Sequence, residues 1–135
     1  MKKKMFRVLM LSAVLGSIAI LTQSFSTMNE QDEPWVVPEK FVNMDNPIKG
    51  QLGLGKDMYS LHCKSCHGKE GLGDGPKAEK LDTPSGDFTD EEFQGQSDGV
   101  LFYKTWIGRD DMPAFDKKMS QTEAWAVVNY MRTFE

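Results

Sequence analysis

The spacing of apolar positions predicts a helix just before the middle of the chain. In residues 51–63 the apolar and small positions recur three, four and seven residues apart, the rhythm of an amphipathic helix. These positions are Leu52, Gly55, Tyr59 and the pair His62/Cys63. We therefore expect a helix that carries its buried face directly into Cys63.

The clearest helix signal lies at the C-terminus. Ser120 and Glu123 have the spacing of a capping box, in which each side chain satisfies a backbone N–H of the other residue. An apolar stripe follows at helical spacing: Ala124, Val127, Val128, Met131 and Phe134. Ser97 is placed to cap a shorter helix that runs through Trp106 and stops at Gly108.

The chain has no alternating pattern of useful length that would predict a β-strand, and no internal repeat is visible. The predicted fold class is therefore all-α. We expect one small domain, residues 51–135, in which several helices are joined by long loops.

Residues 1–27 have the pattern of an export segment. Basic residues precede an uncharged, mostly apolar run from Val8 to Leu21, and small polar residues follow. The run is short for a membrane-spanning helix, which needs about 20 apolar residues. A cleaved signal peptide is favoured, and an uncleaved membrane anchor stays open because the cleavage motif is imperfect. Either alternative predicts a periplasmic protein.

Residues 28–50 begin acidic and then carry three prolines, which argue against a regular helix or a central strand. The prediction is a linker or an extended arm. Trp35, Val36, Val37 and Phe41 are more apolar than a flexible tether needs. The second half of the arm therefore either lies against the domain or docks another protein.

The charge balance is acidic, with 16 basic and 20 acidic residues. Removal of residues 1–27 would take four basic residues and no acidic ones, leaving 12 basic residues and a net charge of −8. Such a domain is a poor nucleic-acid binder and would be steered towards a partner with a basic docking surface. The equal alternative is that the charge serves solubility alone.

The segment Cys63-Lys64-Ser65-Cys66-His67 concentrates the chemistry of the chain. Its two cysteines are the only ones in the sequence. Their spacing suits covalent attachment of one haem c through two thioethers, with His67 as an axial iron ligand. A haem would also supply the interior that a domain of about 85 residues lacks by itself.

The chain resembles a monohaem class I c-type cytochrome from about residue 50 to residue 135. The motifs that carry the resemblance occur in the family's order: Gly55 and Tyr59, Cys63-x-x-Cys66-His67-Gly68, Gly71-x-Gly73-Asp74-Gly75-Pro76, Met112-Pro113, and Tyr130 in the closing helix. The resemblance implies a helical fold wrapped around one haem c. It also implies single-electron transfer.

A second axial ligand must come from the opposite side of the haem, and Met112 is the candidate. It lies in a loop after a helix stop, where Pro113 would help to hold its thioether inward. Met58, Met119 and Met131 fall in or beside predicted helices, where methionine usually fills core gaps. The family's Met-Pro pattern points to the same position.

His62 is the only other histidine, and it adjoins Cys63 on the same side of the haem as His67. We expect it to be a surface or packing residue. Ligation by His67 and Met112 would fill both axial positions and raise the reduction potential. This pattern favours electron relay over catalysis.

Three further residues are candidates for contacts around the haem. In the family that the chain resembles, the proline carbonyl of the glycine-rich loop accepts a hydrogen bond from the ligand histidine, which implies this role for Pro76. Arg109 and Trp106 could bond the haem propionates. The alternatives are that Arg109 is a surface charge and Trp106 a core aromatic.

Three functions follow from these observations. The first is an exported carrier that moves one electron between a redox protein donor and acceptor. The second is a dedicated cytochrome subunit of a larger oxidoreductase or respiratory complex. The third is a thiol-disulfide enzyme, which the helical pattern disfavours because that chemistry is typical of a βαβ setting. We prefer the carrier. A membrane contact is expected only through residues 1–27, if these are retained.

Overall fold

The computed structural model describes residues 34–134, which fall within one compact unit. The predicted export segment and the start of the arm lie outside the described residues. Helices follow one another in the order α2 (Glu39–Val42), α3 (Leu52–His62), α4 (Lys64–His67), η2 (Ala78–Lys80), α5 (Glu91–Gln94), α6 (Asp98–Ile107) and α7 (Gln121–Met131). Residues 34–134 contain no β-strand, only an isolated bridge between Arg109 and Met112. The all-α prediction is confirmed.

The two predicted helix caps are present. Ser97 precedes α6, and its hydroxyl accepts a hydrogen bond of 3.3 Å from the backbone N–H of Val100. Ser120 precedes α7, and the backbone N–H of Ser120 donates to Glu123 at 2.7 Å while Glu123 N–H donates to the Ser120 hydroxyl at 3.3 Å. Both helices therefore begin where the sequence predicted, because a cap depends only on residues within one turn.

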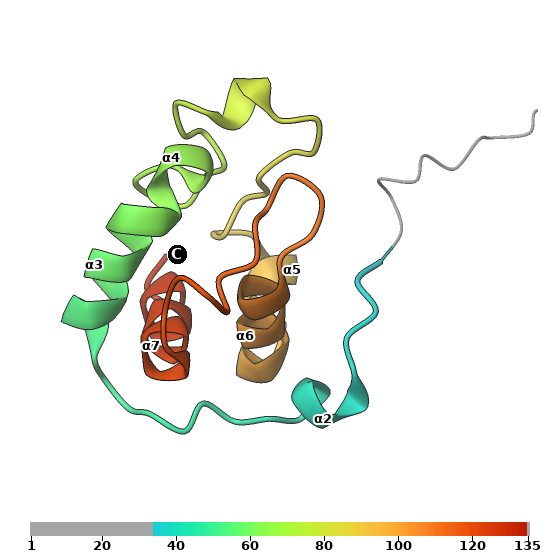
Figure 1. Ribbon diagram of the computed structural model, residues 1–135, viewed down its shortest axis with the longest axis vertical. Helices are drawn as coiled ribbons and strands as arrows, with labels where there is room; N and C mark the ends of the chain where they lie inside the picture. Colours follow the sequence, from blue (N-terminus) through green and yellow to red (C-terminus); the bar gives the residue numbers. More distant parts are fainter. Residues whose placement is uncertain (1–33, 135) are drawn as a thin grey trace, which may run out of the picture. The chain divides into compact units, whose positions relative to one another are not determined.

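Helices α3 and α7 cross side by side and share the most extensive contact between helices, and α6 also packs against α7 (Figure 1). At the crossing Gly55 lies so close to α7 that an added Cβ would overlap the backbone carbonyl of Ala126. Tyr59, one turn further on, is only 1% exposed, and its ring packs against Tyr130 at 5.4 Å and Phe134 at 5.2 Å, which also contact each other. This crossing fixes the end of α3, which leads into Cys63.

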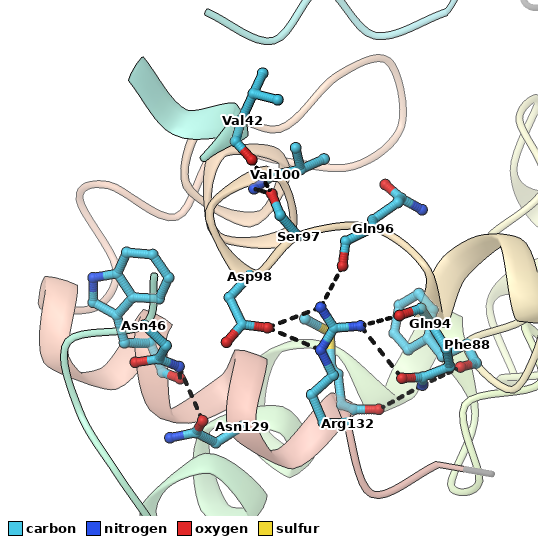
Figure 2. Close-up of polar contacts among 12 residues, drawn as sticks. Val42, Asn46, Phe88, Gln94, Gln96, Ser97, Asp98, Val100, Asn129 and Arg132 are labelled. Carbon is cyan, nitrogen blue, oxygen red and sulfur yellow. Dashed lines mark hydrogen bonds and ion pairs between the residues drawn. The ribbon is translucent and has the colours of Figure 1, made fainter. Parts of the chain in front are cut away.

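The arm packs against the helices rather than standing apart. Its second half forms one turn of helix, α2, directly after Pro38, where the missing proline N–H costs nothing. The Phe41 ring lies 4.9 Å from the Tyr103 ring of α6. Asn46 is buried, and its amide donates to the Trp125 carbonyl at 3.1 Å and to the Asn129 side chain at 2.9 Å, a bond drawn in Figure 2.

The loop after α4 and the loop after α6 lie at the same end of the helices (Figure 1). They are tied together where Thr83 N–H donates to the Asp111 carboxylate at 2.9 Å. Among residues 34–134, no helix combines the length and the apolar character that crossing a membrane requires.

Candidate functional site

The Cys63–His67 segment forms a turn of its own. Helix α3 ends at His62, and α4 starts after Cys63, which separates the two helices. The predicted helix is therefore present, and it ends directly at the start of the motif. Cys63 is buried, Cys66 is half-buried, and both thiols are free.

The glycine-rich loop holds α4 from one side. Gly73 N–H donates to the His67 carbonyl at 2.9 Å, Gly75 N–H to the Cys66 carbonyl at 3.0 Å, and Lys77 N–H to the Ser65 carbonyl at 2.8 Å. A Cβ on Gly75 would come within 2.6 Å of the Cys66 carbonyl oxygen. Glycine is therefore needed there so that the two backbones can approach closely.

A tight turn presents Met112. Arg109 and Met112 exchange both backbone hydrogen bonds, at 2.8 and 2.9 Å, and Asp110 between them has a positive φ of 53°. Gly108 also has a positive φ, 65°, and an added Cβ there would overlap the backbone of Met112 and Pro113. The position of Met112 is thus set by its backbone as well as by the following proline.

Two adjoining cavities bring the predicted ligands together. Their volumes are about 640 and 790 Å³ when the open space at their mouths is included. Both are lined by Trp35, Cys63, His67, Ser85 and Met112. Cys66 lines the first cavity only. The structure therefore places the imidazole of His67 and the thioether of Met112 on shared cavities, although they come from different parts of the chain.

The protonation of the site follows from its burial. Burial lowers the pKa of His67 to about 4, and a contact with the Ser85 backbone opposes this shift. The imidazole is therefore neutral at pH 7, the form that binds metals. Burial, together with the nearby Cys66, raises the pKa of the Cys63 thiol to about 12.

The other candidate residues have mixed outcomes. Arg109 lines the first cavity, and its guanidinium carbon lies 4.5 Å from the centre of the Trp35 ring. Trp106 lines neither cavity and stacks on Phe102 at 5.5 Å, the contact of a core aromatic. His62 lines the first cavity and packs edge-on against Phe115 at 5.7 Å.

Pro76 is exposed and lines neither of the two cavities. The Nδ1 atom of His67 is buried and has no hydrogen-bond partner among residues 34–134, so the structure contains no bond from this atom to the Pro76 carbonyl. The role that the resemblance implies for Pro76 stays a prediction.

Sequence reasoning missed several cavity residues. Among them are Trp35, Ser85, Phe88 and Lys104. Of these residues, only Trp35 could have been suspected from the sequence, because a flexible arm has no need of a large apolar side chain. The others lie in segments whose local pattern shows no preference for the site.

Residues 50–131 match the family model described as cytochrome C oxidase, cbb3-type, subunit III. The chain belongs to the c-type cytochrome family. No curated protein matches it. The family implies a covalently bound haem c and haem-based electron transfer.

Two solved structures are similar to this cytochrome. The KustC0563 c-type cytochrome is 31% identical, with a TM-score of 0.54, and the match covers 60% of this chain and 96% of that chain. The Kuenenia stuttgartiensis reducing HAO-like protein complex Kustc0457/Kustc0458 is 32% identical, with a TM-score of 0.59. That match covers 76% of this chain but 50% of the other, so the cytochrome corresponds to about half of it.

The residues of the cavities fit a haem c. Cys63, Cys66, His67 and Met112 supply two free thiols, a neutral imidazole and a thioether, and all four residues line the same pair of largely apolar cavities. Among residues 34–134, no group of three or more His, Cys, Asp and Glu side chains could hold a metal ion by itself. One imidazole and one thioether are donors that suit the iron of a porphyrin.

Proposed function

We propose that this cytochrome is an exported carrier that moves single electrons between redox proteins. One haem c would be attached through thioethers to Cys63 and Cys66 and ligated by His67 and Met112. The observation that carries the proposal is the placement of His67 and Met112 on the same two cavities as Cys63. Such a haem supplies reversible one-electron chemistry.

Each residue has a separate task in this proposal. The two cysteines anchor the group next to α4, whose position is fixed by the glycine-rich loop. His67 offers a neutral ring because burial has already lowered its pKa. Met112 offers a weakly basic thioether, which favours the reduced state over the oxidised one and so raises the potential. With His67 and Met112 both holding the iron, no coordination site would stay open, which would favour electron relay over substrate chemistry.

The thiol chemistry of Cys63 argues against the alternative of a thiol-disulfide enzyme. Reactive cysteines have a lowered pKa in a partly exposed, electropositive setting. Cys63 is buried, and its pKa is raised to about 12. Its environment suits an anchored, non-reactive sulfur.

A dedicated subunit of a larger oxidoreductase is the second candidate. One similar solved structure is a complex, and this cytochrome matches half of that chain. The two candidates differ in assembly state. A carrier purifies as a free protein of its own mass, whereas a subunit elutes together with a catalytic partner in a native-size measurement.

The intact mass of the protein, purified from its native exported or membrane fraction, tests the proposal. We expect one haem-sized adduct that survives denaturation and the absence of residues 1–27. Retention of those residues would replace the soluble carrier by a membrane-tethered one. An unmodified chain with the two-proton deficit of a disulfide would overturn the haem assignment.

A further inference from the structure

The face of the His67 ring is covered by an aromatic stack. The Phe88 ring lies 4.4 Å from the His67 ring at an interplanar angle of 27°, and Phe93 lies on the other side of Phe88 at 4.3 Å and 20°. Phe88 is 7% exposed and lines the second cavity next to His67. The imidazole is thus the end member of a three-ring stack that reaches the cavity.

Ligand histidines are usually oriented by a hydrogen bond to the ring nitrogen that does not bind the metal. Here Nδ1 of His67 is buried and has no hydrogen-bond partner of good geometry among residues 34–134, while the backbone of Ser85 lies close enough to the ring to oppose the lowering of its pKa by burial. The stacked Phe88 ring, together with the Ser85 backbone, therefore restrains the plane of the imidazole.

The backbone of Phe88 is held on both sides. Its N–H donates to the Gly71 carbonyl at 2.7 Å, and its carbonyl accepts from Nε2 of Gln94 at 2.7 Å. Gln94 Nε2 also lies 3.1 Å from the Met131 carbonyl and 2.9 Å from the Phe134 carbonyl. Its two hydrogens are therefore shared among three acceptors, the Phe88 carbonyl and two carbonyls at and just beyond the end of α7.

Arg132 holds Gln94 from the opposite side, as Figure 2 shows. Its guanidinium donates to the Gln94 carbonyl at 2.6 Å and to the Asp98 carboxylate at 2.8 and 2.9 Å, and it also bonds the Gln96 carbonyl. Its Nη1 lies 3.4 Å from Oε1 of Gln94, which leaves Nε2 facing the carbonyls of Phe88 and α7. The Arg132 guanidinium thus orients the Gln94 side-chain amide, and that amide holds the backbone of Phe88.

We propose that Phe88 is a positioning residue that sets the plane of the His67 imidazole above the haem iron, and that Gln94 and Arg132 hold Phe88 in place. This inference rests on the proposed ligation by His67. A flat ring against the imidazole restricts its rotation and excludes water from that face. Neither effect needs a hydrogen bond to Nδ1.

The test uses the haem-loaded protein and three variants. Phe88→Leu removes the stack on His67. Phe102→Leu is the matched control, because Phe102 is 4% exposed, is equally part of the core, and stacks on Trp125 rather than on His67. Gln94→Leu leaves the Phe88 ring intact and removes the amide that holds its backbone, which keeps the proposal testable if Phe88→Leu folds poorly.

The readouts are the hyperfine-shifted haem-methyl resonances of the oxidised protein, which report the plane of the axial ligand, and the midpoint potential. We expect Phe88→Leu to rearrange the methyl pattern and shift the potential. Gln94→Leu should change both in the same direction but less, and Phe102→Leu should leave both unchanged while lowering the melting temperature.

An unaltered methyl pattern in Phe88→Leu with its haem in place would overturn the positioning role, as would an equal change in Phe102→Leu. Both outcomes leave the proposed function intact. Wild-type protein that carries no covalent haem would instead overturn the proposed function, so the two failures are distinguishable.

Discussion

The hydroxyl of Tyr59 donates a hydrogen bond of 2.9 Å to the carbonyl of Gly68, the residue that follows His67. Tyr59 belongs to α3 and is 1% exposed, so this bond joins the buried helix crossing to the backbone of the haem motif. The same burial raises the pKa of Tyr59 above its ordinary value and keeps the hydroxyl protonated as a donor. Packing of α3 against α7 and placement of His67 are therefore coupled through one side chain.

Replacing Tyr59 with Phe should lower the free energy of unfolding by about 1–3 kcal/mol, because the buried Gly68 carbonyl loses its partner. The measurement is urea denaturation of the haem-loaded protein. Tyr130→Phe is the control, since the Tyr130 ring packs on Tyr59 at 5.4 Å and makes a ring contact that survives the change. A cost in Tyr130→Phe as large as that in Tyr59→Phe would contradict the prediction.

Substitution of Gly55 by Ala should separate α3 from α7. The new methyl group would overlap the Ala126 carbonyl, and relief requires a shift of the helix backbone. We expect a loss of about 3 kcal/mol or more in unfolding free energy, or failure to accumulate folded protein.

Gly53→Ala provides the matched control on the same helix, because a Cβ at Gly53 meets nothing within 4 Å. That variant should be neutral or more stable by about 0.5–1 kcal/mol, the helix propensity gained over glycine. Thermal melts of the two variants side by side give the comparison, and equal stabilities would show that the crossing is not as tight as described.

Met112→Leu should abolish the sulfur-to-iron charge-transfer absorption of the oxidised protein. Its midpoint potential should fall by on the order of 0.1 V or more, since axial ligands set haem potentials over about 0.8 V. Met119→Leu is the control, because Met119 is 6% exposed in the core and lines neither cavity. If Met119→Leu rather than Met112→Leu abolished the absorption, the proposed iron ligand would be Met119 and not Met112.

The capping box of α7 should make stability depend on pH in the acid range. Hydrogen bonds from the backbone and side chain of Ser120 lower the pKa of Glu123 below its ordinary value of 4.5. The folded state therefore gains stability above that value and loses it as the pH falls through the lowered pKa. Melting temperatures of Glu123→Gln should fall less on acidification than those of the wild type. Glu79→Gln, at an exposed position, is the control. If the melting temperatures of Glu123→Gln and the wild type fell equally with pH, the capping box would not be the source of the pH dependence.

Electron exchange with a basic partner should slow as salt is added, because the protein without residues 1–27 carries a net charge of −8. Asp110→Asn tests a charge that lines the cavity beside Met112, and Asp57→Asn on α3 is the control. Stopped-flow rates against ionic strength should show a weaker salt dependence in the first variant. Wild-type rates that do not change with ionic strength would contradict electrostatic steering. The net charge would then serve solubility alone.

The caps of α6 and α7 and the cysteine spacing could be predicted from the sequence because each depends on residues a few positions apart. Ser120 reaches Glu123 within one helical turn, so its bond forms whatever the rest of the chain does. The CxxCH pattern is likewise local, and it indicated the haem and His67 without a fold. Even the choice of Met112 rested on its neighbours, the helix stop at Gly108 and the following Pro113.

The tertiary structure alone decided which residues surround those ligands. Trp35 comes from the arm and Phe88 from the loop before α5, and both reach the cavity only because α3, α6 and α7 pack as they do. No local pattern marks Phe88, since its role depends on a ring stacked on His67 and on an amide held by Arg132 from the far end of α7. Contacts between distant segments form only when the whole chain has packed its core. For that reason the sequence predicted the ligands proposed for this cytochrome but not the residues that surround them.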